Sequence, residues 1–311
     1  MTTDPFHLPE PFQSAARELA TVADFIRWGA SRLNEAGVFF GHGTDNALDE
    51  AAALVLHALH LDPAPPVEVF GARLTEAEKG TVLGLLRRRV EDRVPLPYLT
   101  HEAWFAGLPF YVDERVLVPR SPIAELIETG FEPWVAGDEV KAVLEIGTGS
   151  GCIAIACAMA FPHARVDATD ISDQSLDVAL ENVKRHGLVE RVHLHRADVF
   201  QGLEPAAGYD IIVSNPPYVD RRELRRMPAE YRREPLLGLE AGEDGLDVVR
   251  RILEGAPRFL APGGILVVEV GASRPALEAA YPNLPFYWPD FERGGEGVFI
   301  LEAAAISGTV Y

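Results

Sequence analysis

The chain has 311 residues, 48% of them hydrophobic, and a formal net charge of −19 at pH 7, so it is long enough for two domains and too acidic for DNA to be its main partner. Its acidity would attract a basic protein over a distance, although solubility alone would equally account for it. No run of about eighteen apolar residues occurs, and Met1–Pro11 has neither the basic nor the apolar part of a secretion signal, which predicts a cytoplasmic protein that does not act at a membrane.

The first 94 residues predict a small helical domain that recognises the substrate. Residues 14–37 carry an apolar stripe at helical spacing and end at a glycine, which fits one or two amphipathic helices. A further helix is expected over residues 47–61, with Asp45 as its cap.

A third helix is predicted to begin at Thr75, because Thr75-x-x-Glu78 is a capping-box pattern, and to run to about Arg93. Its apolar positions are spaced to lie on one face, while the charge run between them suits a solvated face. We expect Leu83, Leu86 and Val90 to face inward and Arg87, Arg88 and Arg89 to be largely solvated.

Residues 95–120 are predicted to link this domain to the next. From Glu102 to Val116 the pattern changes to aromatic and β-branched residues around Gly107-Leu108-Pro109. Such a pattern is typical of a β-hairpin.

A second domain, residues 121–311, is expected to be catalytic. Ser121 followed by Pro122 is a helix start, because proline suits the first helical position, and the helix should reach about Trp134. Arg120, just before it, suits a structural ion pair better than a substrate contact.

A strand, a glycine turn and a helix follow one another from Lys141 onwards. Lys141–Ile146 is a short apolar strand, Gly147-Thr148-Gly149-Ser150-Gly151 is the turn, and Cys152–Ala160 is the helix. Glycines let a ligand approach the backbone closely, and this order is typical of nucleotide-binding units. The G-x-G-x-G spacing differs from the dinucleotide-binding G-x-G-x-x-G. Glu145 precedes the turn, where it can meet a cationic amino group.

Two more predicted strands end close to acidic residues. Ala164–Thr169 ends at Asp170, which can accept hydrogen bonds from both hydroxyls of an adenosine ribose. Val192–His195 leads to Asp198 and Val199, which suit the amino group and the ring face of adenine.

The apolar run Ile211–Val213 stops at Ser214-Asn215-Pro216-Pro217-Tyr218. It reads as a buried strand that the two prolines terminate, since neither can donate to a ladder. The Asn215 side-chain oxygen and the Pro216 carbonyl can accept both hydrogens of a planar amino group on which Tyr218 stacks, as methyl transfer to that nitrogen would require. A turn that merely ends a strand is the alternative for this motif taken alone.

The segment after this turn is basic and irregular up to about Pro235, which makes it a candidate lid or substrate channel. Strands 284–288 and 297–301 are expected to form an antiparallel pair at one sheet edge. Between these regions we expect a helix over 245–259, a turn at Pro262-Gly263-Gly264, a strand over 265–270 and a helix over 275–280.

The histidines and cysteines give no sign of a metal site or a disulfide. His193 and His195 alternate on one predicted strand without a third ligand at a recognisable spacing. Cys152 and Cys157 lie five apart in one predicted helix, as packing residues would. We therefore expect no metal.

The ordered strand ends resemble those of the class I S-adenosylmethionine-dependent methyltransferases, in the branch that carries Asn-Pro-Pro-Tyr. Over roughly residues 20–302 the chain is similar to the protein N5-glutamine methyltransferases. The resemblance implies a Rossmann-like α/β fold with a seven-stranded sheet, S-adenosyl-L-methionine as methyl donor and S-adenosyl-L-homocysteine as product. Further matches are Tyr98-Leu99-Thr100, Ala103-Trp104-Phe105, Phe110-Tyr111-Val112 and Glu240–Leu246.

The resemblance also assigns roles to residues. It implies Asn215, Pro216 and Tyr218 as catalytic, and Pro217 as a further substrate-binding residue. For the cofactor it implies Glu145, Gly147, Thr148, Gly149, Gly151, Asp170, Ile171, Asp198, Val199 and Asn215.

The sequence Pro119-Arg120-Ser121-Pro122-Ile123 bears on the substrate. Release-factor methyltransferases carry Pro-Arg-Pro-Asp-Thr here, whereas Arg-Ser-Pro together with Trp104 and Tyr111–Arg115 resembles the branch that methylates a glutamine of large-subunit ribosomal protein L-three. That protein, free or in an assembly precursor, is the implied partner.

Three alternatives stay open: a release-factor substrate, an adenine amino group in a nucleic acid, and an inactive binding module. The net charge and the helical first domain argue against the nucleic acid. Intact Asn215 and Tyr218 argue against an inactive module.

Overall fold

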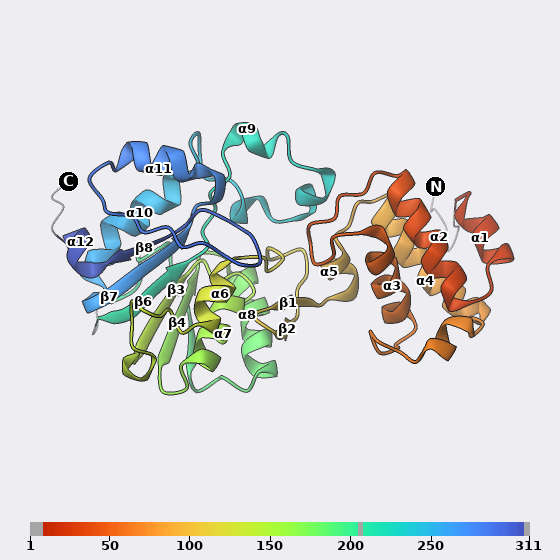
Figure 1. The fold of residues 1–311 in the computed structure, drawn as a ribbon, viewed down its shortest axis with the longest axis horizontal. Helices are drawn as coiled ribbons and strands as arrows, with labels where there is room; N and C mark the ends of the chain where they lie inside the picture. The colour runs from red at the N-terminus through yellow and green to blue at the C-terminus, as the bar shows by residue number, and fades with distance from the viewer. Residues whose placement is uncertain (1–8, 205–207, 308–311) are drawn as a thin grey trace. The chain divides into compact units, whose positions relative to one another are not determined.

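The computed structural model describes residues 9–204 and 208–307 (Figure 1). Residues 1–8 lie outside these ranges. They make up most of Met1–Pro11, the segment that was expected to contain no secretion signal. The chain divides into two compact units: unit 1 holds the described residues up to Glu102 together with Pro228–Arg233, and unit 2 holds Ala103–Met227 and the residues from Glu234 onwards. No helix in the described ranges is both long enough and apolar enough to cross a membrane.

Unit 1 is helical, as predicted. The apolar stripe at residues 14–37 forms two helices, and the capping box at Thr75 is present, with the Glu78 carboxylate accepting from the Thr75 backbone N–H at 2.6 Å. The helices are α1 (Phe12–Glu18), α2 (Val22–Glu35), α3 (Ala47–Ala58), α4 (Glu76–Val90) and α5 (Leu96–Thr100), with a 3-10 turn η1 (Val67–Gly71).

The cap of α3 differs from the prediction. Asn46, not Asp45, is the N-cap: its side-chain oxygen accepts from the backbone N–H groups of Leu48 at 3.1 Å and Asp49 at 2.9 Å. The Asp45 carboxylate instead accepts a hydrogen bond from the Asn46 side-chain amide. Both residue types cap helices well, so the sequence alone could not choose between neighbours.

The expectation that Arg89 is solvated was wrong. Its side chain is fully buried, where it pairs with Glu50 of α3 and lies 3.3 Å from the carboxylate of Glu230 in η3 (Ala229–Arg233). It also donates to the Phe39 carbonyl at 2.7 Å. Arg89 follows buried Leu86 by three residues and therefore lies on the apolar face of the helix, unlike the partly exposed arginines just before it.

Unit 2 is built around one mixed sheet with the strand order β5-β4-β3-β6-β7-β8, in which only β8 is antiparallel to its neighbour. The strands are β3 (Ala142–Ile146), β4 (Arg165–Asp170), β5 (Val192–Arg196), β6 (Tyr209–Ser214), β7 (Leu260–Glu269) and β8 (Val298–Glu302). This confirms the Rossmann-like class and the predicted strand–turn–helix units.

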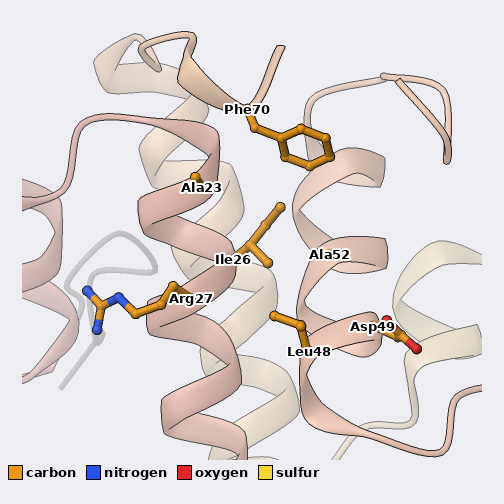
Figure 2. A pocket seen from close by; sticks show the side chains of 7 residues that line it. All are labelled: Ala23, Ile26, Arg27, Leu48, Asp49, Ala52 and Phe70. Atoms are coloured by element: carbon orange, nitrogen blue, oxygen red, sulfur yellow. The ribbon is translucent and has the colours of Figure 1, made fainter. Parts of the chain in front are cut away.

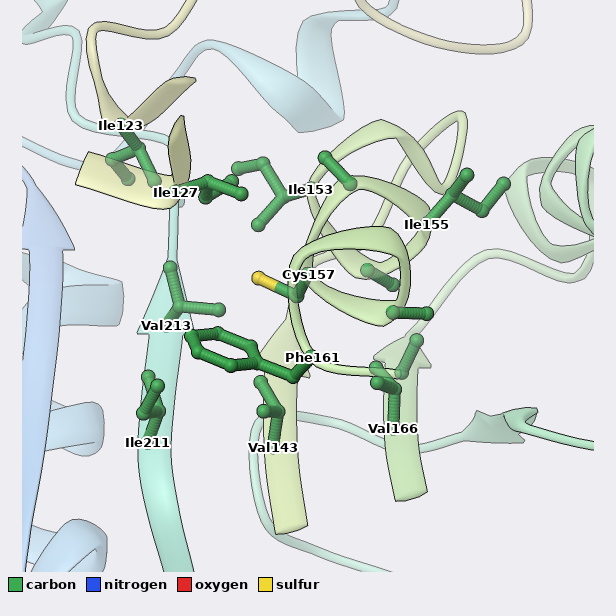
Figure 3. Close-up of a cluster of buried hydrophobic side chains, with 14 of the residues drawn as sticks. Ile123, Ile127, Val143, Ile153, Ile155, Cys157, Phe161, Val166, Ile211 and Val213 are labelled. Carbon is green, nitrogen blue, oxygen red and sulfur yellow. The ribbon is translucent and has the colours of Figure 1, made fainter. Parts of the chain in front are cut away.

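Alternate strand residues enter two separate cores, one on each face of the sheet. Val143, Ile211 and Val213 pack with α6 (Ile123–Glu128) and α7 (Cys152–Ala160), as Figure 3 shows. Their neighbours in sequence pack on the other face, with α10 (Asp247–Gly255), α11 (Arg274–Ala280) and α12 (Ala303–Ser307). The free cysteines of α7 are both buried, as packing residues should be. A further helix, α8 (Asp173–Arg185), lies between β4 and β5 in sequence.

The expected count of seven strands needs correction, because the sheet formed by the described residues has six. Residues 284–288 form only one isolated antiparallel bridge, Tyr287 to Ile300 of β8. Pro285 and Pro289 flank the bridging residue and have no N–H to donate, which explains why no ladder forms. β7 also begins earlier than expected, since Leu260 already pairs with Tyr209.

The linking hairpin is present, with β1 (Ala103–Phe105) antiparallel to β2 (Leu108–Phe110). Ala106 and Gly107 have φ values of +47° and +73°, as a two-residue type I′ turn requires.

The helix α6 ends at Glu128, short of Trp134, because Gly130 at φ +63° takes the chain out of the helical conformation.

Candidate active site

Sheet register brings the predicted site residues to one edge. Ile146, the last residue of β3, pairs with Thr169 of β4 on one side and with Ser214 of β6 on the other. His195 of β5 pairs with Thr169 in turn. All these strands are parallel, so the glycine turn, the acidic residues after β4 and β5, and the Asn-Pro-Pro-Tyr turn leave the sheet at the same edge, where ligands bind in such folds.

The glycine turn is fixed by the neighbouring strand. The backbone N–H groups of Gly147 and Thr148 both donate to the Thr169 carbonyl at 2.8 Å. Gly147 and Gly149 have φ values of +74° and +54°, which glycine adopts without steric penalty. A Cβ atom added at either position would meet no atom of the described residues within 4 Å, so the backbone is open to a ligand there.

Asp170 ties the end of β4 to this turn. Its Oδ2 accepts from the Gly149 backbone N–H at 2.9 Å, and its Oδ1 accepts from the Ser172 backbone N–H at 2.9 Å. Burial raises the pKa of the carboxyl, and these hydrogen bonds oppose the rise. Each oxygen keeps a second lone pair for a ligand hydroxyl. Ile171, the next residue, is 44% exposed and offers apolar surface beside it.

Glu145 lies behind the turn and supports it. The side chain is buried, and its Oε2 accepts from the Thr148 hydroxyl and from the Ala154 backbone N–H at 2.9 Å. Burial raises the pKa of Glu145 to about 8. Thr148 is likewise buried, so its side chain serves the turn while its backbone faces Thr169.

This buried carboxyl predicts a pH dependence of stability for the cofactor-free protein. A raised pKa means that the folded state keeps a proton which the unfolded chain has released, so stability is full below the ordinary Glu value and is lost as pH rises towards 8. The free energy of unfolding should fall by up to about 1.4 kcal/mol per pH unit in that interval. Urea unfolding of the wild type and Glu145→Gln between pH 5 and pH 8 measures it. The variant should lack this part of the slope, and equal slopes would show that Glu145 is ionised throughout.

The residues after β5 carry a strained position and an ion pair. Asp198 pairs with Arg251 of α10, with 2.9 Å between Oδ1 and Nη1, a partner that sequence spacing did not reveal. Val199 has a φ of +59°, which is rare for a β-branched residue. A strained residue of this kind persists only where the surrounding structure enforces it, and such residues cluster at ligand sites.

The Asn-Pro-Pro-Tyr turn leaves one amide side chain available. The Ser214 hydroxyl is used internally, donating to the Ile146 carbonyl at 2.7 Å. The Asn215 side chain is half-buried, and none of the described residues forms a hydrogen bond with it. Pro216 is buried and Pro217 half-buried. Within the described ranges, the hydrogen-bonding groups of the Asn215 side chain therefore stay free at the sheet edge.

One further side chain at this edge, that of Glu269, was missed by the sequence reading. Glu269, the last residue of β7, is buried and accepts from the Tyr218 hydroxyl at 2.7 Å and from the Ser121 hydroxyl at 2.5 Å. Burial raises the pKa of Glu269 and, with the nearby carboxyl, also that of Tyr218. The available signal was a glutamate inside an apolar strand, because a buried charge there needs specific partners.

Arg120 forms the structural ion pair that was expected of it. Its two terminal nitrogens lie 2.5 Å from the two carboxylate oxygens of Glu234, a bidentate arrangement.

The basic segment after the turn is built from the short helix α9 (Arg221–Leu224) and from η3 and η4 (Leu236–Gly238). Arg221 pairs with Glu240 at 2.9 Å.

A hollow of about 400 Å³ lies in unit 1 (Figure 2) and contains none of the predicted site residues. Its lining comes from α2, α3 and η1 and is mostly apolar: Ala23, Ile26, Arg27, Leu48, Asp49, Ala52 and Phe70. In the part of the chain that the structure describes, no three His, Cys, Asp or Glu side chains form a group suited to a metal ion.

The chain is similar to known methyltransferases. Residues 134–230 match the family model described as methyltransferase small domain. The chain is 54% identical over 289 residues to a protein named ribosomal protein uL3 glutamine methyltransferase from Xylella fastidiosa (strain Temecula1), covering 93% of this chain and 92% of that one. A protein of the same name from Neisseria meningitidis serogroup B is 50% identical over 298 residues, covering 96% of this chain and 98% of the relative.

Among solved structures, the catalytic domain of hMettl16 in complex with MAT2A 3′UTR hairpin 6 is similar in fold. The TM-score is 0.50 at 18% sequence identity, and the match covers 75% of this chain and 84% of that one. At that identity the similarity concerns the fold alone.

Proposed function

Since the chain belongs to the family of ribosomal protein uL3 glutamine methyltransferases, we propose that it methylates the side-chain amide nitrogen (N5) of a glutamine in uL3, the large-subunit protein L-three, with S-adenosyl-L-methionine as donor. One observation carries the proposal. The Asn215 side chain has no hydrogen-bonding partner among the described residues, and it lies at the sheet edge, one strand away from the open glycine turn.

The cofactor would lie along the carboxyl edge of the sheet. The open backbone at Gly147 and Gly149 suits a closely approaching ligand, as does the exposed apolar surface of Ile171. In this proposal Asp170 accepts from the ribose hydroxyls, and Asp198 and Val199 hold the adenine. Gly151 is the N-cap of α7, while Glu145 and Thr148 hold the turn beside the amino acid part of the cofactor.

When bound, S-adenosyl-L-methionine supplies an electrophilic methyl group on a sulfonium centre. The chain's own task is to orient a poorly nucleophilic amide. Asn215 Oδ1 and the Pro216 carbonyl accept the two N–H hydrogens, and the Tyr218 ring stacks on the amide plane, so that the nitrogen lone pair faces the methyl group. Orientation and fixed dipoles of this kind supply most of such a rate enhancement. No strong base is needed, because the nitrogen becomes acidic once it carries the methyl group.

Asp170→Ala tests the cofactor assignment. The substitution removes a charged acceptor from the proposed ribose site and should weaken S-adenosyl-L-methionine binding by about 2 to 3 kcal/mol. Calorimetry measures the change, with Asp173→Ala as a control on the exposed start of α8 that should bind normally. Unchanged affinity in Asp170→Ala would place the ribose elsewhere.

The partner assignment rests on charge and on the family. With a net charge of −19, the chain would attract a basic ribosomal protein, free or in an assembly precursor, and repel naked DNA. The proposed cofactor residues all follow residue 140, which leaves unit 1 for holding the substrate protein. The basic Arg221–Arg233 segment borders the Asn-Pro-Pro-Tyr turn in sequence and is proposed to line the substrate path. In this proposal the methylation takes place in the cytoplasm, where ribosomal proteins are made.

A panel of acceptors tests the substrate. Purified uL3, other ribosomal proteins, peptide release factors and an RNA are each incubated with the enzyme and labelled S-adenosyl-L-methionine. The label should enter uL3 alone. Transfer to a release factor in its place would move the chain to the sister branch, and transfer to the adenine of an RNA would overturn a protein substrate altogether.

A further inference from the structure

We propose that Glu269 is a positioning residue for this reaction: it fixes the Tyr218 ring at the amide site, and Ser121 in turn fixes Glu269. The proposal rests on the function proposed above and goes beyond it, since it assigns a role to a carboxylate outside the Asn-Pro-Pro-Tyr motif. Tyr218 itself would touch the substrate amide, whereas Glu269 would act through it.

The sheet places Glu269 beside the catalytic turn. Val268 of β7 pairs with Ser214 of β6, its neighbouring parallel strand. Glu269 follows Val268 and Asn215 follows Ser214, so the two residues lie at the carboxyl ends of adjacent strands. Glu269 is only 4% exposed. It is therefore a buried carboxylate at the sheet edge where methyl transfer would take place, within reach of the turn.

Its two oxygens are assigned to two different segments of the chain. Oε1 accepts from the Tyr218 hydroxyl at 2.7 Å, and Oε2 accepts from the Ser121 hydroxyl at 2.5 Å, just before α6. Both distances are typical of strong hydrogen bonds to a carboxylate. The nearby guanidinium of Arg120 is itself paired with Glu234. Since each carboxylate oxygen of Glu269 already accepts a hydrogen bond, the residue is suited to fixing the Tyr218 side chain and not to removing a proton from the substrate.

The rest of Tyr218 is held by close packing. A Cβ atom at Gly271 would lie 2.6 Å from the Tyr218 ring, and one at Gly245 would lie 2.3 Å from the Tyr218 carbonyl oxygen. The same carbonyl accepts from the Ser273 hydroxyl at 2.9 Å. Backbone and ring face are thus fixed by neighbours, and the hydroxyl end of the ring is fixed by Glu269.

Stability alone does not explain a glutamate at this position. Burying a carboxylate is unfavourable, and an apolar side chain of similar size in a buried strand is often as stable or more so. What an apolar side chain cannot do is accept one hydrogen bond from the turn and another from the segment before α6. Directional control of the Tyr218 ring is the property that the carboxylate adds.

A double-mutant cycle between Glu269 and Tyr218 tests the proposal in the full-length enzyme. Glu269→Gln keeps size and one acceptor but turns an NH2 group towards the second donor, and Tyr218→Phe keeps the ring but removes its hydroxyl. Each single variant should lower kcat for uL3 methylation about tenfold with a nearly unchanged KM, because orientation and not binding is lost. The double variant should be only about as slow as either single variant, since both remove the same interaction. Cofactor affinity and melting temperature should stay close to those of the wild type.

Ser121→Ala gives an independent arm if Glu269→Gln folds poorly. It removes only the outer hydrogen bond, so it should lower kcat more weakly, and that loss should vanish in the Tyr218→Phe background. If the two effects multiply, so that kcat of the Glu269/Tyr218 double variant falls about a hundredfold, the positioning role is overturned. So would losses of kcat that merely follow losses of melting temperature. A wild type that is inactive on uL3 would overturn the proposed function as well, whereas an active wild type with multiplying effects overturns the role of Glu269 alone.

Discussion

Asn215→Ala is expected to lower kcat about a hundredfold or more while cofactor affinity stays nearly intact. The Asn215 side chain has no hydrogen-bonding partner among the described residues and stands at the edge where the substrate amide would lie. Removing a single preorganised hydrogen-bonding group of this kind typically has an effect of that size on turnover. Steady-state methylation of uL3 and calorimetry with S-adenosyl-L-methionine measure the two quantities separately.

Asn215→Asp is the matched variant, because it keeps the shape and an acceptor oxygen. It adds a negative charge next to a cofactor whose sulfonium is positive, so cofactor binding should tighten while turnover falls. Full activity in either Asn215 variant would show that this side chain does not orient the amide.

Arg89→Ala is expected to destabilise unit 1 by about 3 to 5 kcal/mol, the range found when one partner of a buried ion pair is removed. The substitution leaves the buried carboxylates of Glu50 and Glu230 without their cation and the Phe39 carbonyl without its donor. Arg93 also lies 3.4 Å from the Glu230 carboxylate, so the substitution leaves a cation beside Glu230 but not beside Glu50. Chemical denaturation measures the change.

Arg87→Ala is the control, two residues earlier on the same helix. Its pairs with Glu91 and Asp92 span 3.5 Å on a partly exposed surface, and such pairs contribute about 1 kcal/mol at most. Equal losses for the two arginines would mean that Arg89 is not the buried cation of unit 1.

Local patterns in the sequence predicted much of the fold because their causes are local. The strand, glycine turn and helix at residues 142–160 were predicted almost to the residue, and so was the capping box at Thr75. An N-cap contact across three residues depends only on neighbours along the chain. The convergence of the strand ends followed from their being parallel.

The features that were missed depend on partners far away in sequence. Arg89 looked like part of a solvated charge run, but it is buried against Glu50, 39 residues earlier, and Glu230, 141 residues later. Glu269 was hidden inside an apolar strand because its partner Ser121 lies 148 residues earlier. The missing seventh strand had a local cause, the prolines flanking Tyr287, whose weight was underestimated against the apolar pattern.

The most direct measurement is fragment mass spectrometry of uL3 after incubation with S-adenosyl-L-methionine and either the wild type or Asn215→Ala. The methyl group should be found on the side-chain nitrogen of one glutamine with the wild type and be nearly absent with the variant. A methyl group on another residue type, or equal methylation by both enzymes, would contradict an amide-orienting role for the Asn-Pro-Pro-Tyr turn.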